Sequence, residues 1–313
     1  MDKDRPIDDP RVNQLDVAVK VAAILLALIV IGFSTYYYLD RYAFSSPSVA
    51  ELAVSRDEAA AIDDPQSFDA RMRLASAYIQ RGMIGEAMDQ YQAALKLRPG
   101  STDAMLGLAL MYAGMDNDKA QPLLEKVIEG RKAGEFASED TKLATAYYTL
   151  ATIQYQASQY ELAAGNALEA SKITRTDADT RLVLAKSYQA LGKMDEAIEQ
   201  YREALRFTPE FTAAYQGLEE CYRKTGRADE AEWAGAMAQF ASGSYNEAVA
   251  RLTRLATKAP TMKEVQWGLG VTFARMKDTE KASAAFRAAL AIDPSYKEAK
   301  DGLARLGIAP QDK

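Results

Sequence analysis

Few side chains in this 313-residue sequence could do covalent or acid–base chemistry. Cys221 is the single cysteine, and a thiol becomes a nucleophile only where a neighbouring base or positive charge lowers its pKa. The sequence contains no histidine, which removes the commonest general base and the commonest transition-metal ligand. We therefore expect Cys221 to be a small buried residue and not a nucleophile.

Two other patterns are typical of active sites but lack the surroundings that such sites need. Adjacent carboxylates occur at Asp63–Asp64 and Glu219–Glu220, where no neighbouring residue predicts a perturbed pKa. The stretch Gly268–Phe273, GLGVTF, resembles part of a nucleotide-binding loop, but it follows no predicted strand and lies within a predicted helix. We therefore predict no catalytic residue, no metal site, no cofactor and no small-molecule substrate, and we expect that the protein is not an enzyme.

Composition and charge narrow the class of protein further. Hydrophobic residues make up 48% of the chain, which is enough for a packed core, and the frequent alanines favour helix. The net charge is −6 and the pI is about 5.1, which argues against nucleic acid as a partner because phosphates require a basic surface. One cysteine allows no intrachain disulfide, so the fold must be stable without one.

One segment near the amino terminus is long and apolar enough to cross a membrane. Val21–Leu39 contains 19 residues without a charge, and about 20 residues span a bilayer as a helix. A cleaved signal peptide is the alternative, but the charged leader and the apolar run are both long, and bulky tyrosines follow. Charged and tyrosine residues at the two ends of the helix favour the headgroup region, and we expect them at the membrane interface: Lys20, Tyr36, Tyr37, Tyr38, Arg41 and Tyr42.

The distribution of basic residues predicts the orientation of this segment. Lys3, Arg5, Arg11 and Lys20 precede it, whereas only Arg41 and Arg56 occupy the comparable stretch after it. The positive-inside rule then places the amino terminus in the cytoplasm and the large carboxy-terminal part outside it. We expect a single-pass protein of a bacterial inner membrane with its soluble part in the periplasm. A cell surface and an organelle lumen remain open.

A repeated pattern occupies the rest of the chain. Tyr78–Pro99 and Tyr188–Pro209 align without gaps and share a tyrosine, a glycine, an alanine, a second tyrosine, a second alanine and a proline at identical spacings. Phe273–Pro294 keeps both aromatic residues, both alanines and the proline, but has Lys277 where the other two have the glycine. Such internal repetition is typical of solenoid proteins.

These residues resemble the tetratricopeptide repeat, a helix–turn–helix unit of 34 residues. In that family, small residues let two antiparallel helices approach closely, an aromatic residue fills the space between units, glycine makes the turn and proline ends the second helix. The resemblance implies an all-α fold: a right-handed superhelical α-solenoid of antiparallel helix pairs, here preceded by one transmembrane helix. The unit that follows the pattern best contains Leu184, Ala185, Tyr188, Gly192, Ala197, Tyr201, Ala204 and Pro209.

The spacing of the prolines shows where the array is irregular. Pro65 and Pro99 are 34 residues apart, as are Pro260 and Pro294, but Pro209 and Pro260 are 51 apart, one and a half units. We therefore predict that one helix, at Asp229–Ala241, serves both of its neighbouring units. Between Pro99 and Pro209 the distance is three units plus eight residues, and we place the extra residues at Gly130–Asp140. Gln154 stands where an aromatic residue belongs.

The predicted organisation follows from these boundaries. We expect a disordered tail at 1–16, a transmembrane helix at 17–42, a linker with a first half-repeat helix (about Ser48–Ile62) at 43–67, a solenoid of six to seven units at 68–294 with one helix shared near 229–241, and a capping helix (Tyr296–Leu306) with a tail at 295–313. The units are predicted to begin near Phe68, Thr102, Ala144, Ala178, Thr212 and Lys263.

The resemblance also implies where a partner protein binds. In such arrays the first helix of each pair lines the concave side, and an extended peptide or an amphipathic helix fits that groove. A phase error of one residue would instead place several of these side chains inside the fold. On the family's phase, the residues expected in the groove are Met72, Ser76, Ile79, Leu106, Leu110, Tyr148, Thr152, Tyr155, Leu182, Lys186, Gln189, Gln216, Glu220, Arg223, Trp267 and Val271.

Two functions are compatible with this layout. The first is a membrane-anchored scaffold that recruits, assembles or stabilises other proteins through the concave surface. The second is an integral accessory subunit of a larger respiratory or envelope complex, whose span packs on other transmembrane helices through small residues such as Ala22, Ala23, Ala27 and Gly32. Neither the identity of the partner nor the oligomeric state follows from the sequence.

Overall fold

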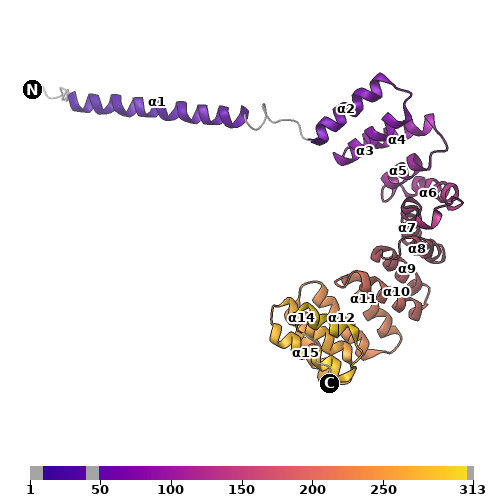
Figure 1. Cartoon of the computed structure of the whole chain (residues 1–313). Coiled ribbons are helices and arrows are strands. Elements are labelled where there is room, and N and C mark those ends of the chain that lie inside the picture. Colours follow the sequence, from indigo (N-terminus) through magenta and orange to yellow (C-terminus); the bar gives the residue numbers. More distant parts are fainter. Residues whose placement is uncertain (1–9, 40–48, 309–313) are drawn as a thin grey trace, which may run out of the picture. The chain divides into compact units, whose positions relative to one another are not determined.

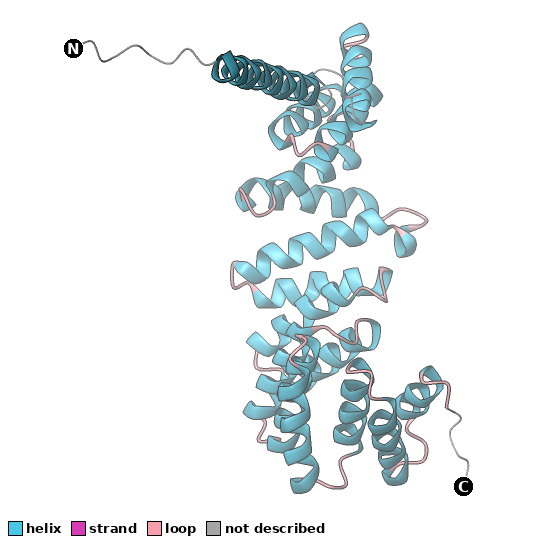
Figure 2. Cartoon of the chain, turned by 90° about the vertical axis from the view of Figure 1, so that its left-hand side faces the viewer, coloured by secondary structure: helices cyan, strands magenta, loops and turns pink. Residues whose placement is uncertain are grey.

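The computed structural model describes residues 10–39 and 49–308, and every regular element in these two ranges is a helix (Figures 1 and 2). The predicted all-α solenoid fold is therefore confirmed. The elements are α1 (Pro10–Tyr38), α2 (Val49–Asp63), α3 (Phe68–Gln80), α4 (Ile84–Leu97), α5 (Thr102–Tyr112), α6 (Asn117–Lys132), the 3-10 helix η2 (Ala137–Glu139), α7 (Thr141–Gln156), α8 (Tyr160–Ile173), α9 (Ala178–Ala190), α10 (Met194–Phe207), α11 (Thr212–Lys224), α12 (Ala228–Ala241), α13 (Tyr245–Lys258), α14 (Lys263–Arg275), α15 (Thr279–Ile292) and α16 (Lys297–Arg305).

Helix α1 is the predicted apolar helix. Its segment Val19–Tyr38 has a mean hydropathy of 2.1, and none of it is buried within the chain. Among the described residues it is the one helix long and apolar enough to cross a membrane, a criterion that a signal sequence also meets. Of the residues predicted at the interface, Lys20 and the three tyrosines Tyr36, Tyr37 and Tyr38 are exposed, whereas Arg41 and Tyr42 lie outside the described residues.

The remaining helices fall in two compact units that divide within α4, between Ala87 and Met88. The first unit has a small core in which Val54 and Ala61 of α2 pack with Leu74 and Tyr78 of α3. The Tyr78 hydroxyl donates a hydrogen bond of 2.7 Å to Glu58 on α2, and burial together with this carboxylate raises the pKa of Tyr78 to about 12. Helix α2 thus covers the apolar face of α3, as the predicted half-repeat requires.

Helices of the second unit alternate between two rows. Helices α5, α7, α9 and α11 contact one another in sequence, whereas α6, α8 and α10 do not approach one another as closely. The first helices of the pairs therefore form the tighter row, which is the inner side of a curved stack. Figure 2 shows these antiparallel helices as successive layers.

Most predicted repeat boundaries coincide with helix starts, and one does not. Helices begin at Phe68, Thr102, Ala178, Thr212 and Lys263, but α7 begins at Thr141, three residues before the predicted Ala144. The cause is Asp140, whose side chain accepts hydrogen bonds from the backbone N–H groups of Lys142 (2.9 Å) and Leu143 (3.1 Å) and so caps the helix earlier. Asp140 is itself held by Arg131 at the end of α6, at 2.6 Å.

The turns within the helix pairs have the left-handed backbone conformation that favours glycine. Gly192 has φ of +76°, and Gly243 has φ of +85°. Lys277, which stands at the place of the turn glycine, adopts the same conformation with φ of +64°, and Ser158 does so between α7 and α8 with φ of +60°. The turn geometry is therefore kept at these two positions despite the steric cost of a side chain there.

A pairing that the sequence analysis did not anticipate joins successive repeats. A large side chain on one second helix lies against a glycine sixteen residues later, on the next first helix. A Cβ atom on the glycine would lie too close to the aromatic ring in three of these pairs, and at a tight 3.3 Å from Leu252 in the fourth. In one further pair the second helix carries the smaller residue. Ala167 on α8 and Val183 on α9 are also sixteen residues apart, and both belong to one core cluster. The glycine pairs are Tyr91–Gly107, Tyr201–Gly217, Leu252–Gly268 and Phe286–Gly302.

Helix α12 lies between two helix pairs and contacts both. It packs against α11 on one side and α13 on the other, and it also contacts α14. Eight of its fourteen residues are buried, from Ala231 to Phe240, because a helix enclosed on several sides is apolar all round. A second row of contacting helices, α12, α14 and α16, begins here. The row that lines the inner side therefore changes at α12.

An ion pair crosses the shared helix at Gly235. Arg251 of α13 contacts Glu219 of α11 at 3.2 Å and Glu232 of α12 at 3.5 Å. A Cβ atom on Gly235 would lie about 2.5 Å from the Arg251 guanidinium, so a larger residue there would force this flexible side chain to shift. The two helices that flank α12 are thus joined across it by a half-buried charge pair.

The large-residue–glycine pairing predicts a specific stability effect at Gly217. Replacing Gly217 with alanine places a methyl group against the Tyr201 ring, and we expect the free energy of unfolding to fall by about 1–3 kcal/mol, as for other overpacked cores. The measurement is urea unfolding followed by circular dichroism.

Two control variants make this test specific. Gly165 lies on α8, where an added Cβ atom would meet nothing within 4 Å, so Gly165→Ala should raise the same free energy by about 0.5–1 kcal/mol. In a Tyr201→Leu background, Gly217→Ala should cost clearly less than in the native chain. An equal cost in both backgrounds would show that the ring is not the cause.

Candidate interaction surface

The inner row of the second unit brings together most of the residues predicted for the groove. On α7, Tyr148, Thr152 and Tyr155 are half-buried and follow one another along one helix face. Helices α9 and α11 contact α7 and each other in sequence, so their predicted residues lie on the neighbouring members of the same row. Those residues are Leu182, Lys186 and Gln189 on α9, all half-buried, and Gln216, Glu220 and Arg223 on α11, all exposed.

A polar cluster connects three helices of this row with α10. The Tyr201 hydroxyl on α10 donates a hydrogen bond of 2.5 Å to the side-chain oxygen of Gln189 on α9. Lys224 lies 2.8 Å from Glu220 on α11, and hydrogen bonds from Lys224 and Gln189 hold the pKa of Glu220 below its usual value. Burial raises the pKa of Tyr155, and the nearby Tyr160 and Glu220 raise it further. Tyrosine, amide and carboxylate groups therefore converge at the middle of the row.

Tyr148 lies in an acidic environment at the start of α9. Burial raises the pKa of its hydroxyl, and the carboxylates of Asp179 and Asp177 act in the same direction. The Thr152 hydroxyl donates to the Tyr148 carbonyl oxygen at 2.9 Å, so this side chain is engaged with its own helix. Tyr148 and Tyr155 are thus two half-buried aromatic side chains on the same face of α7.

The structure separates other predicted residues from this surface. Leu106 is only 6% exposed and packs in the core with Ala109 and Leu124, so its assignment to the groove is wrong. The cause is that α5 turns this face toward α6 and α7. Leu110 is half-buried against the same core.

Five predicted residues lie on other helices than α7, α9 and α11. Met72 and Ile79, both half-buried, lie on α3 in the first compact unit, together with the exposed Ser76. Trp267 and Val271 lie on α14 in the second row of helices and pack against the core. The predicted single groove is therefore divided at the shared helix.

The patterns that could suggest chemistry have structural roles. Glu219 pairs with Arg223 (3.0 Å) and Arg251, and Gly270 of GLGVTF receives the ring of Phe286. Cys221 is fully buried, and burial raises the pKa of its thiol to about 11. In the part of the chain that the structure describes, no group of three histidine, cysteine or acidic side chains is placed to hold a metal ion.

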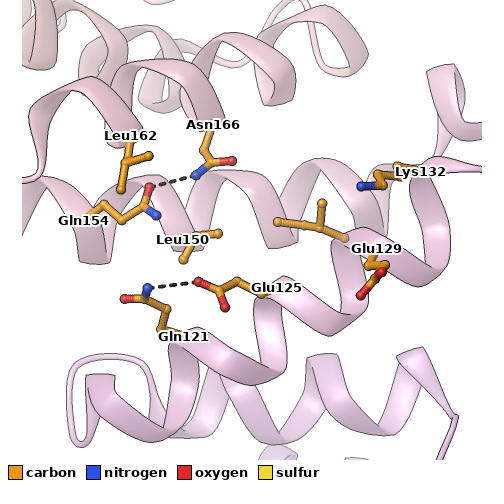
Figure 3. A pocket seen from close by; sticks show the side chains of 9 residues that line it. Gln121, Glu125, Glu129, Lys132, Leu150, Gln154, Leu162 and Asn166 are labelled. Carbon is orange, nitrogen blue, oxygen red and sulfur yellow. Dashed lines mark hydrogen bonds between the residues drawn. The ribbon is translucent and has the colours of Figure 1, made fainter.

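A pocket on the opposite, outer side escaped the sequence analysis. It has a volume of about 390 Å³ and lies between α6, α7 and α8 (Figure 3). Gln121 and Glu125 of α6 face Leu150 and Gln154 of α7 across it. The one signal in the sequence was Gln154, the residue that replaces an aromatic side chain of the repeat.

Comparison with known protein families agrees with this architecture. Three family profiles described as tetratricopeptide repeat match residues 68–111, 182–234 and 239–306. The solenoid is built from tetratricopeptide repeats. A fourth profile, anaphase-promoting complex, cyclosome, subunit 3, matches residues 113–204, which include the tetratricopeptide units at α7–α8 and α9–α10.

Solved structures share this tetratricopeptide-repeat fold. The crystal structure of MamA protein is 25% identical, covers 57% of this chain and 94% of its own, and gives a TM-score of 0.50. YrrB, a tetratricopeptide-repeat protein with an unusual peptide-binding site, is 16% identical over 79% of this chain and 97% of its own, with a TM-score of 0.46. The hetero-tetramer Cut9-Hcn1 is 16% identical over 82% of this chain and 46% of its own, with a TM-score of 0.43. No curated protein matches the chain in sequence.

The burial of Cys221 within its tetratricopeptide unit predicts that the thiol is inert. With a pKa near 11, only about one thiol in a thousand is ionised at pH 8, and no solvent reaches the sulfur. We expect no labelling of the native protein by iodoacetamide at pH 8, and complete labelling in 8 M urea, measured by mass spectrometry. Rapid labelling of the native protein would restore Cys221 as a candidate nucleophile.

Proposed function

We propose that this protein is a membrane-anchored scaffold that recruits or stabilises partner proteins through the inner surface of α7, α9 and α11. The observation that carries the proposal is the convergence of Tyr155, Gln189 and Glu220 on one open face. Repeat arrays of this type are typically non-enzymatic and bind peptides or other proteins, and we propose the same for this chain.

The chemistry of this face favours an extended polypeptide as the partner. Tyr148 and Tyr155 supply large, partly apolar surfaces that lose little conformational entropy on binding. The exposed amide of Gln216 can donate and accept hydrogen bonds from a peptide backbone, and Lys186 adds a positive charge on the neighbouring helix. The surface offers no basic cluster suited to nucleic acid and no cofactor site.

Helix α1 supports the membrane part of the proposal. All twenty residues from Val19 to Tyr38 are unburied within the chain, and a helix this apolar is stable in lipid. We propose that it spans the membrane with the amino terminus in the cytoplasm, and that the repeats lie on the extracytoplasmic side, in the periplasm of a bacterium.

If α1 anchors the protein, the chain should resist extraction from membranes at high pH. The native chain should stay in the membrane pellet at pH 11, whereas Leu26→Arg combined with Ile29→Arg should release it, because each central charge costs about 2.5–3.5 kcal/mol of insertion free energy. The matched control is Leu52→Arg, an exposed position on α2 that should leave the protein in the pellet. Release of the native chain, or loss of its first forty residues in the mature protein, would contradict the proposal.

The orientation is tested with engineered cysteines. In a Cys221→Ala background, Ser138→Cys introduces an exposed thiol before α7, and Asp2→Cys introduces one near the amino terminus. A membrane-impermeant maleimide should label Ser138→Cys in intact cells whose outer barrier has been opened, and Asp2→Cys only after lysis. The opposite pattern would place the repeats in the cytoplasm.

The inner surface predicts which substitutions reduce partner capture. Tyr155→Ala removes a large ring from the middle of the row, and such anchors commonly contribute about 2 kcal/mol, so capture from native membranes should fall about tenfold or more. The readout is quantitative mass spectrometry of proteins bound to the intact chain. Leu168→Ala, on α8 of the outer row, should leave capture unchanged. If the Tyr155→Ala and Tyr148→Ala variants each captured as much partner protein as the native chain does, this surface would be excluded as the binding site.

An accessory subunit of a larger membrane complex is the second candidate. It is favoured by α1, which has no packing partner in its own chain and carries Gly32, where an added Cβ atom would meet nothing within 4 Å. The native mass after extraction in mild detergent distinguishes the two functions, because a stoichiometric complex that depends on α1 supports the accessory subunit.

A further inference from the structure

We infer that the pocket between α6, α7 and α8 binds an aromatic side chain of a partner segment that carries a basic residue next to it. The pocket lies on the outer side of the second unit, so the inference goes beyond the scaffold surface on the inner row and does not depend on it.

The pocket adjoins a repeat in which the usual aromatic residue is absent. Five first helices carry an aromatic side chain at this place in the repeat, namely Tyr78, Tyr112, Tyr188, Tyr222 and Phe273, whereas the shared helix α12 has Gln239 there. In α7 the equivalent residue is Gln154. A glutamine side chain is thinner than an aromatic ring and leaves part of the site unfilled.

Two regular junctions show what the missing ring would contact. At both junctions, one residue of the preceding second helix contacts the aromatic residue. This residue stands five places after the first alanine of its helix. Gln92 donates a hydrogen bond of 3.2 Å to the Tyr112 hydroxyl, and the Arg202 guanidinium lies 5.9 Å from the centre of the Tyr222 ring. At the third junction this residue is Glu125, which faces Gln154 across the pocket (Figure 3).

The walls of the pocket combine apolar surface with one buried amide. Leu150 and Ile128 are buried apolar residues, and Leu162 is 56% exposed at the edge. Gln154 is only 3% exposed, and its side-chain oxygen accepts a hydrogen bond of 2.7 Å from Asn166. Its amide nitrogen has no hydrogen-bond partner among the described residues, so a donor is available inside the pocket. The pocket is thus an open, mixed site, with apolar surface from Ile128, Leu150 and Leu162 beside polar groups that could orient a ligand.

Charge on the rim favours a basic neighbour. Glu125 and Glu129 of α6 are exposed carboxylates, and Lys132 is the single cation that lines the pocket. The Gln121 amide donates to Glu125 at 2.9 Å, which orients the carboxylate without neutralising it. A lysine or arginine next to the inserted ring would meet these carboxylates, whereas an acidic segment would be repelled.

The occupant we commit to is therefore a Phe or Tyr followed by Arg or Lys in an extended segment of another protein. The ring restores the contact that five other repeats make with their own aromatic residue, and its face can receive the Gln154 amide. A second copy of this chain is a poorer occupant because the protein is acidic overall, with a net charge of −6.

The test uses the full chain in detergent micelles and three small probes. N-acetyl-Phe-Arg-amide is compared with N-acetyl-Phe-Glu-amide and N-acetyl-Ala-Arg-amide by saturation-transfer NMR titration. We expect the Phe-Arg probe to bind with a dissociation constant on the order of 1 mM, as a ligand of this size allows, and the other two to bind at least fivefold more weakly. Equal binding of all three probes would overturn the inference.

Three variants locate the binding site. Gln154→Tyr fills the pocket with the repeat's own ring, so it should abolish binding and raise the melting temperature. Glu125→Gln combined with Glu129→Gln should remove the preference for Phe-Arg over Phe-Glu. Leu162→Lys, at an exposed position that cannot disturb the core, should weaken Phe-Arg at least fivefold even if Gln154→Tyr fails to fold.

The matched control is Leu52→Lys on α2, an equally exposed leucine outside both proposed surfaces, which should bind the Phe-Arg probe as the native chain does. Undiminished binding by Leu162→Lys, or by a folded Gln154→Tyr, would show that the probe binds elsewhere, including the micelle, and would overturn the inference.

Discussion

The close approach of successive helix pairs is the constraint on which the array depends. The ring of Tyr201 packs against Gly217, and the ring of Phe286 packs against Gly270 and Gly302. At these three glycines a Cβ atom would clash with the ring. Dispersion contacts of a buried ring are individually small but numerous, so the stacking of repeats depends on this match of size. Where the large residue is absent, its partner is larger, as with Ala167 and Val183.

The shared helix shows how the same constraint allows the array to change direction. In α12 the residue at the place of Tyr201 is Gly235, and the space above it is occupied by the guanidinium of Arg251. That group reaches Glu219 on α11, so a charge pair replaces an aromatic contact. Because α12 then acts as the first helix for α13, the tight row continues as α12, α14 and α16. A half-unit in the sequence thereby becomes two rows of contacting helices in one chain.

The sequence predicted the helices well because their signals are local. Proline spacing, turn glycines and paired alanines depend on residues within one unit, and helix starts such as Phe68 and Lys263 follow from them. The early start of α7 was missed because it depends on Asp140, a cap that lies in the inserted segment and is held by Arg131 from α6. Leu106 was misassigned because burial at that position depends on how α6 and α7 pack around α5. The polar cluster of Gln189, Tyr201 and Glu220 was only partly foreseen, since its members come from three helices that no local pattern relates.

Departures from a repeat pattern become informative once the compensating contacts are known. Lys277 departs from the turn glycine but keeps the turn, with φ of +64°, so its departure changes nothing around it. Gly235 stands where other second helices have a large residue, and the Arg251 guanidinium occupies the space that this residue would fill. Gln154 replaces the aromatic residue, and its side-chain oxygen accepts a hydrogen bond from Asn166. An open volume of about 390 Å³ nevertheless remains beside it. A buried amide bordering unfilled space gives up the packing that a ring would supply. Among these three departures, Gln154 is therefore the one that leaves open volume beside it, and the binding we infer for the pocket depends on that volume.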